Sequence, residues 1–315
     1  MTRFGSRSRV GTALSEWGFP TGDNLEVAPT SLDFLVVAGG GGGAGDLNTV
    51  GGSGGGAGGL RCSVGSTGGG GILPSAVTIS ASTVYTITVG SGGAGRTSRT
   101  DDGANGGTSS IAGSDIATIS TTGGGRAGYT QSQAGVAGGS GGGGGYPSMA
   151  GGTGTANEGF GGAVGSGVSP LAGAGGGGAG AVGVVPSGAG AGAGGIGIVT
   201  NISGSSTYYA GGGGGGLNAS GGTVGAGGLG GGGAGGALTA NHGNPATANT
   251  GGGGGGATVD AVTTARNGGN GGSGIVILRY PSTNADAVST TGSPSLVTSG
   301  GYKIYTFTAS GTITF

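Results

Sequence analysis

Runs of glycine limit what this chain can fold into more than any other feature. Glycine supplies 97 of the 315 residues and is uninterrupted at 211–216 and 251–256. Such runs offer no side chains to pack, so an ordinary side-chain core cannot form over most of the length. Between Glu158 and Asp260 there is also no Asp, Glu, Lys or Arg. The chain is therefore either disordered or packed through glycine backbone, and that stretch lacks the charged groups of most catalytic sites.

Composition favours order and excludes several classes. Charged residues make up only 7%, whereas disordered chains usually carry high net charge. Glycine keeps no strict Gly-X-Y period and proline is scarce, which excludes collagen. A net charge of −1 gives no basic field for nucleic acid. Lone Cys62 cannot form an intrachain disulfide, and no apolar run is long enough to predict a membrane-embedded segment or a secretory signal.

Segments typical of β-strands bracket the glycine region. They are rich in β-branched and aromatic residues and lie at 32–38, 76–80, 83–89, 111–120, 274–280, 302–308 and 311–315. We expect hairpins near 76–89, at 111–120 and at 302–315. Residues 35–37 and 275–278 are expected to be sheet neighbours, which would close the fold on itself, and the apolar run at 275–278 predicts burial on both faces.

Polyproline-II geometry explains how glycine-rich tracts can pack into an ordered bundle. It has three residues per turn, a rise of about 3.1 Å and no internal hydrogen bonds. Its N–H and C=O groups point outward and need partners, so bare glycine faces allow neighbouring helices to bond backbone to backbone. We expect 211–216 inside the bundle and alanine-containing tracts such as 188–195 nearer its surface. Consecutive tracts should run up and down, a 20-residue tract spanning roughly 60 Å.

The predicted fold class is therefore all-β/irregular: a polyglycine-II helix bundle bracketed by short β-strands, with little or no α-helix. Residues 1–30 form a predicted N-terminal attachment segment. Residues 31–280 form the bundle with its strands, and 281–315 a small C-terminal β module. The alternative is a β-sandwich with glycine-rich loops.

Three motifs carry a family resemblance: FLVVAGGGGGAG at 34–45, GGGAGGLR at 54–61 and GGSGIVILRY at 271–280. Together they resemble the glycine-rich domain of bacteriophage tail-fibre and other virion structural proteins. Residues 302–315 resemble the β module that accompanies this domain. More distantly, the chain is similar to phage tail-tip adhesins whose polyglycine-II bundle displays receptor-binding loops.

The resemblance implies a virion surface appendage without a cofactor, made in the host cytoplasm without a signal peptide. Residues 1–30 would dock onto another virion protein, with Phe4, Trp17 and Phe19 as candidates. The receptor would be a host-surface glycan or outer-membrane protein, and a homo-oligomer, a trimer by analogy, is expected. No coiled-coil or repetitive shaft is visible, which favours a tip, short spike or decoration over a full fibre.

Receptor contacts are expected in the breaks between glycine tracts, because loops on a rigid scaffold commonly carry recognition. The candidates are Tyr208, Tyr209, Asn201, Tyr146 and His242. Adjacent tyrosines in a Ser/Thr/Asn loop suit contacts with sugar or protein. The alternative is that one of these tyrosines covers an end of the bundle.

Other chemistry is weakly indicated. His242 has no metal-binding neighbours in sequence, and Asp101-Asp102 lacks the distal Glu of a calcium loop. Cys62 with His242 could form a catalytic pair only on paper, since Arg61 alone would favour a thiolate. We expect no enzyme and no metal. The alternatives to an adhesin are a purely structural virion protein and an ice-binding protein, although the regular Thr or Ala face of the latter is missing.

Overall fold

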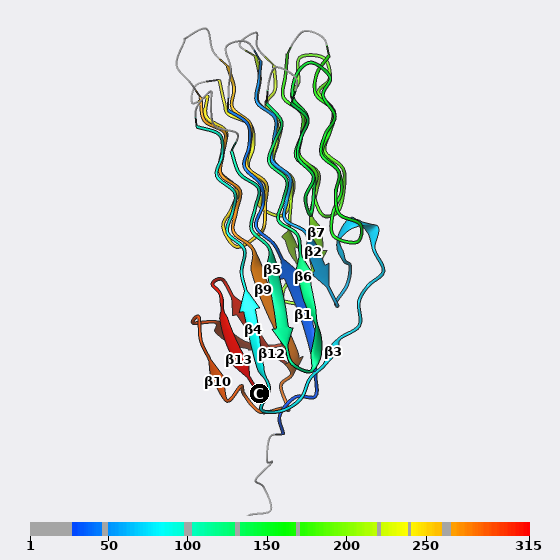
Figure 1. Ribbon diagram of the computed structural model, residues 1–315, viewed down its shortest axis with the longest axis vertical. Coiled ribbons are helices and arrows are strands. Elements are labelled where there is room, and N and C mark those ends of the chain that lie inside the picture. The colour runs from blue at the N-terminus through cyan, green and yellow to red at the C-terminus, as the bar shows by residue number, and fades with distance from the viewer. Residues whose placement is uncertain are drawn as a thin grey trace, which may run out of the picture.

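The computed structural model describes residues 27–45, 50–97, 103–129, 133–167, 171–218, 222–238, 241–259 and 266–315. Phe4, Trp17, Phe19 and most of the predicted attachment segment lie outside these ranges. Within them the fold is all-β without α-helix, and its only helical turn is the 3-10 turn η1 (Gly68–Gly70). Along its long axis the molecule has two parts, a β-sandwich at one end and a bundle of glycine-rich tracts at the other (Figure 1). No helix in the described ranges is long and apolar enough to cross a membrane.

Two antiparallel sheets form the sandwich. The first has the order β11-β12-β9-β1-β2, with β3 also paired to β1, and the second has the order β10-β13-β4-β5-β6. The bounds are β1 Ser31–Val37, β2 Leu60–Cys62, β3 Val77–Thr78, β4 Val84–Thr88, β5 Ser109–Gly113, β6 Ile116–Thr121, β9 Ile275–Pro281, β10 Ser289–Thr290, β11 Ser295–Ser299, β12 Tyr302–Phe307 and β13 Gly311–Thr314. A separate hairpin joins β7 (Ile198–Thr200) to β8 (Thr207–Tyr209).

Strands β1 and β9 are neighbours, as predicted, with Leu35 opposite Ile277. Alternation along β1 sends Phe34 into the core between the sheets and Leu35 into a second cluster, where Tyr209 also packs. Both faces of the first sheet are thus covered. This explains why the apolar part of β9 is buried throughout, in agreement with the sequence.

Two of the three expected hairpins are wrong. The strands near 76–89 exist, but β3 pairs with β1 and β4 with β5 and β13, in different sheets. Likewise β12 pairs with β9 and β11, and β13 with β4 and β10. The connection from β3 to β4 and the connection from β12 to β13 each cross from one sheet to the other. Phe307 and Ile313 therefore meet in the same core. The hairpin expected at 111–120 is confirmed as β5–β6.

Backbone hydrogen bonds join the glycine tracts with a period of three residues. Gly39 and Gly42 donate to one neighbouring tract (104–107), Gly40 and Gly43 to a second (269–272), and Gly41 and Ala44 to a third (53–56), at 2.8–2.9 Å. Polyproline-II geometry presents successive residues in these three directions. The predicted polyglycine-II bundle is therefore confirmed.

The position of a tract in the bundle follows the number of side chains that it carries. Residues 211–216 are buried throughout, as predicted. The alanine-containing tract 188–195 is mixed: 188 and 189 are exposed, whereas 192, 194 and 195 are buried, so its predicted place near the surface holds only for its first part. A Cβ added to Gly213 would lie less than 3.0 Å from the carbonyl group of Gly254. This interior position thus has no room for a side chain.

The chain runs along the bundle many times, and each such pass from one end to the other is shorter than the sequence suggested. Residues 123–145 look like one tract by composition, but Gly142 donates to Val136 and Gly125 to Ser140, so the segment folds back on itself. It makes an ascending pass, which runs away from the sandwich, then a descending pass back toward it, and then a second ascending pass. Each pass is about 15–25 Å long at the polyproline-II rise. The second reversal lies between Val136 and Ser140, where Ala137-Gly138-Gly139 forms no richer break, so composition did not mark it. Between the first two passes, 129–133 is a richer break that the composition does show.

Candidate functional site

The bundle has two unlike ends (Figure 1). At the sandwich end, tracts enter strands or turn back beside them. At the distal end, loops connect the tracts, and the described loop residues include 146–149, 187–190 and 241–242. Val27, the first described residue, lies at the sandwich end, where its carbonyl accepts the Ala285 N–H at 2.9 Å. The described part of the chain therefore begins at the end opposite the distal loops.

Three of the predicted receptor residues lie on the β7–β8 hairpin at the sandwich end. Tyr209 is 5% exposed and packs in the second core cluster, so it covers an end of the bundle, as the alternative interpretation held. Tyr208 is 40% exposed on the other face of the hairpin. Asn201 is exposed at its turn and lines a pocket of ≈ 120 Å³ with Arg279 and Tyr302. Only Tyr208 and Asn201 therefore offer side chains to a partner.

The other two predicted residues lie at the distal end. Tyr146 is half-buried in the loop that follows the ascending pass 139–145. His242 is exposed, and its Nδ1 accepts the Asn267 N–H at 2.9 Å. An imidazole that accepts at Nδ1 keeps its Nε2–H as a donor. The structure divides the predicted set between two ends and brings Tyr146 and His242 to the same one.

A buried arginine stabilises the distal end. Arg96 is 1% exposed, and its guanidinium carbon lies 3.7 Å from the ring centroid of Tyr129, a cation–π contact. Its main chain also bonds two tracts, since the N–H donates to Gly43 and the carbonyl accepts from Gly268. Arg96 thus fixes tracts close to the loops they carry.

The Cys62–His242 pair does not form, because the two residues lie at opposite ends of the molecule. Cys62 is buried in β2 and hydrogen-bonds to the Val64 carbonyl and Thr200. Burial raises the pKa of its thiol above the ordinary value, which disfavours the nucleophilic thiolate. No group of His, Cys, Asp and Glu able to hold a metal occurs in the part of the chain that the structure describes. Asp101 and Asp102 lie outside it.

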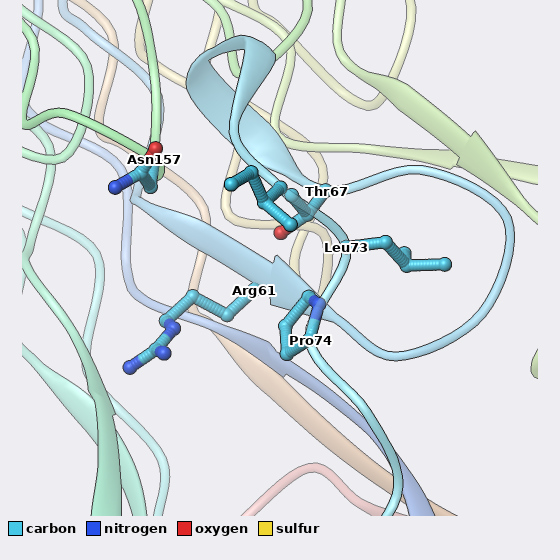
Figure 2. A pocket seen from close by; sticks show the side chains of 6 residues that line it. Arg61, Thr67, Leu73, Pro74 and Asn157 are labelled. Atoms are coloured by element: carbon cyan, nitrogen blue, oxygen red, sulfur yellow. The ribbon is translucent and has the colours of Figure 1, made fainter.

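Sequence reasoning missed a pocket beside β2 at the sandwich end. It measures ≈ 250 Å³ and is lined by Arg61, Thr67, Ile72, Leu73, Pro74 and Asn157. Figure 2 shows that these residues come from β2, from the loop after it and from a turn of the bundle. Ile72 is 93% exposed and Leu73 44%. The signal was present, since Ile72-Leu73-Pro74 is an apolar triplet directly after a glycine run.

Comparison with known proteins gives one family. The model of the family described as "Glycine-rich domain" matches residues 15–281, most of the chain. No curated protein matches the sequence.

Proposed function

The chain belongs to the glycine-rich domain family, and from this premise we propose that it is a bacteriophage virion appendage protein that binds a host-surface receptor through its distal loops. One observation carries the proposal: the loops gather at the end opposite Val27, where the N-terminal segment joins the body. A protein attached by that segment would hold its loops away from the particle. The receptor would be a glycan or an outer-membrane protein.

The scaffold suits this role. Between Glu158 and Asp260 the sequence has no charged residue. The side chains that this part of the scaffold offers to a partner are therefore hydroxyl, amide, aromatic and aliphatic groups. Tyr146 and the Nε2–H of the exposed His242 are contacts of this kind at the distal end. Rigid tracts keep such loops in place, which reduces the entropy lost on binding.

A cell-binding assay tests the proposal. Purified protein would be labelled and titrated onto candidate host cells as the wild type, as the double variant Tyr146→Ala/His242→Ala and as Tyr208→Ala. The last removes an exposed tyrosine at the sandwich end and serves as the matched control. We expect saturable binding that the distal double variant weakens and the control retains. Binding lost only in Tyr208→Ala would place the receptor site at the wrong end for this proposal.

A purely structural virion role is the second candidate, and one observation favours it. Strand β11 is an outermost strand of the first sheet, and its Leu296 and Val297 are 41% and 53% exposed. An uncharged open strand edge is a template for pairing with another chain. Absence of cell binding by all three proteins, together with stable association with other virion proteins, would favour this role.

A further inference from the structure

Arg61 differs from the other basic residues of the described ranges. Arg279 pairs with Asp33 at 2.9 Å and Lys303 with Asp286 at 2.8 Å. Arg96 stacks on Tyr129, and Arg126 and Arg266 also have interaction partners. Within the described residues the half-buried Arg61 side chain has no hydrogen bond or ion pair. Its main chain is fixed opposite Val36 in the β1–β2 ladder, which places the base of the side chain at the pocket.

The pocket beside Arg61 combines donors with an aliphatic wall. Figure 2 shows the Arg61 side chain extending from beside Pro74 toward the side where Asn157 lies, and the Leu73 side chain extending to the opposite side. The Asn157 side chain also makes no hydrogen bond within the described residues. A guanidinium and a carboxamide together suit an oxyanion, and a planar carboxylate fits the guanidinium best.

Asn157 has a left-handed backbone conformation. Its φ is 63°, in a region that asparagine adopts more readily than other side chains do, and Asn241 and Asn249 have similar φ values. Gly71 makes room for it, because a Cβ at Gly71 would lie 2.8 Å from both Cβ and Oδ1 of Asn157. The turn thus presents a carboxamide where a glycine would fit with less strain.

A second pocket continues from the first. It measures ≈ 410 Å³ and shares Arg61 and Pro74 with it, then runs past 75–78 to Asp115 and to β6, an edge strand. Asp115 accepts from the Tyr85 hydroxyl and the Ser80 N–H, both at 2.7 Å. A ligand lying along both pockets would therefore meet a cation first and an anion later, beside an open strand edge.

We propose that these pockets bind the free C-terminus of an extended peptide ending in an aliphatic residue. The terminal carboxylate bonds to Arg61 and Asn157, and the last side chain packs against Leu73 and Pro74. The preceding residues lie along the second pocket, where Asp115 favours a basic side chain. Capture of a chain terminus and pairing at a strand edge are both established modes of peptide recognition. The site lies at the end opposite the distal loops and does not depend on the proposed function.

The test uses the full chain and the peptide Gly-Lys-Gly-Leu, labelled with fluorescein at its N-terminus, by fluorescence anisotropy. Its matched control is the same peptide with a C-terminal amide. The protein variants are Arg61→Met, Asn157→Gly, which suits the positive φ, and Arg126→Met, which removes the same charge outside the pocket. Thermal unfolding checks that each variant is folded.

We expect the free acid to bind and both amidation and Arg61→Met to weaken binding at least about tenfold, since hydrogen bonds to charged groups are the strong ones. Asn157→Gly should weaken it less, and Arg126→Met should leave it unchanged. Equal binding of acid and amide, undiminished binding by folded Arg61→Met, or no binding of the acid at millimolar peptide would overturn the proposal. Arg61-dependent binding of glucuronate or inorganic phosphate without peptide binding would also overturn it.

Discussion

Replacing Gly213 by alanine tests whether backbone contact holds the bundle together. Gly213 lies in the buried run 211–216, and its added Cβ would lie under 3.0 Å from the carbonyl group of Gly254. Its N–H donates to Gly55 and its carbonyl accepts from Gly176, both at 2.9 Å. One methyl group therefore presses on backbone that cannot rotate away, in a position bonded to two further tracts.

The expected cost follows from these contacts. Overpacking costs about 1–3 kcal/mol, and each of the two backbone hydrogen bonds is worth about 0.5–1.5 kcal/mol if the tracts move apart. Alanine loses less chain entropy on folding than glycine, which offsets up to about 1 kcal/mol. We expect Gly213→Ala to lower the free energy of unfolding by about 2–4 kcal/mol, a large share of the usual 5–15 kcal/mol.

Urea denaturation of wild type, Gly213→Ala and a control would measure this. The control is Gly190→Ala in a distal turn, where the nearest atom to an added Cβ is the movable Thr223 Oγ1 at 3.1 Å. It should change stability by less than about 1 kcal/mol. Equal stability of the two variants would refute the idea that close backbone approach, rather than glycine content alone, specifies the bundle.

Three further predictions concern the sandwich end. The hydrogen bond from the Tyr85 hydroxyl lowers the pKa of Asp115 below its ordinary 3.8. The ionised carboxylate therefore stabilises the fold above about pH 4, and this contribution is lost as the pH falls through the pKa of Asp115 in the folded state. In Asp115→Asn the free energy of unfolding should fall less steeply as the pH is lowered through this range. Cys62 should resist a thiol reagent in the native protein and react after unfolding, and rapid native labelling would contradict its burial. Phe307→Ala should cost about 3–5 kcal/mol in denaturant titrations, because the ring is 0% exposed in the shared core; a loss under about 1 kcal/mol would contradict that packing.

The sequence predicted the fold class because its two signals are local. The continuous apolar run in β9 indicated burial on both faces, and the glycine runs indicated which tracts are central. Strand pairing was harder, since the links after β3 and β12 look like hairpin turns yet cross between sheets. The crossing depends on Phe307 and Ile313 meeting in one core, a long-range fact that no short segment contains.

The candidate site was predictable only in part, because its geometry depends on how many passes the chain makes. Each pass reverses the end at which the next loop lies, and passes that turn within glycine leave no compositional mark. Tyr208 and Tyr146 both stand in breaks of suitable composition, but only the fold shows that they face opposite ends. The role proposed for Arg61 could not be predicted for another reason: it rests on the absence of an acceptor near its guanidinium, and sequence does not show missing partners.

The rare side chains inside the bundle explain how glycine tracts find their register. Ser53 is 2% exposed, and its hydroxyl donates to the Gly144 carbonyl at 2.7 Å and accepts the Ala174 N–H at 3.1 Å. Thr258 is 0% exposed and bridges in the same way, with its hydroxyl bonded to the Gly236 carbonyl and the Leu217 N–H. A glycine helix can slide by three residues and bond equally well, but a hydroxyl fits only where a neighbouring backbone leaves a gap. Such side chains therefore select one register among many that glycine alone would allow.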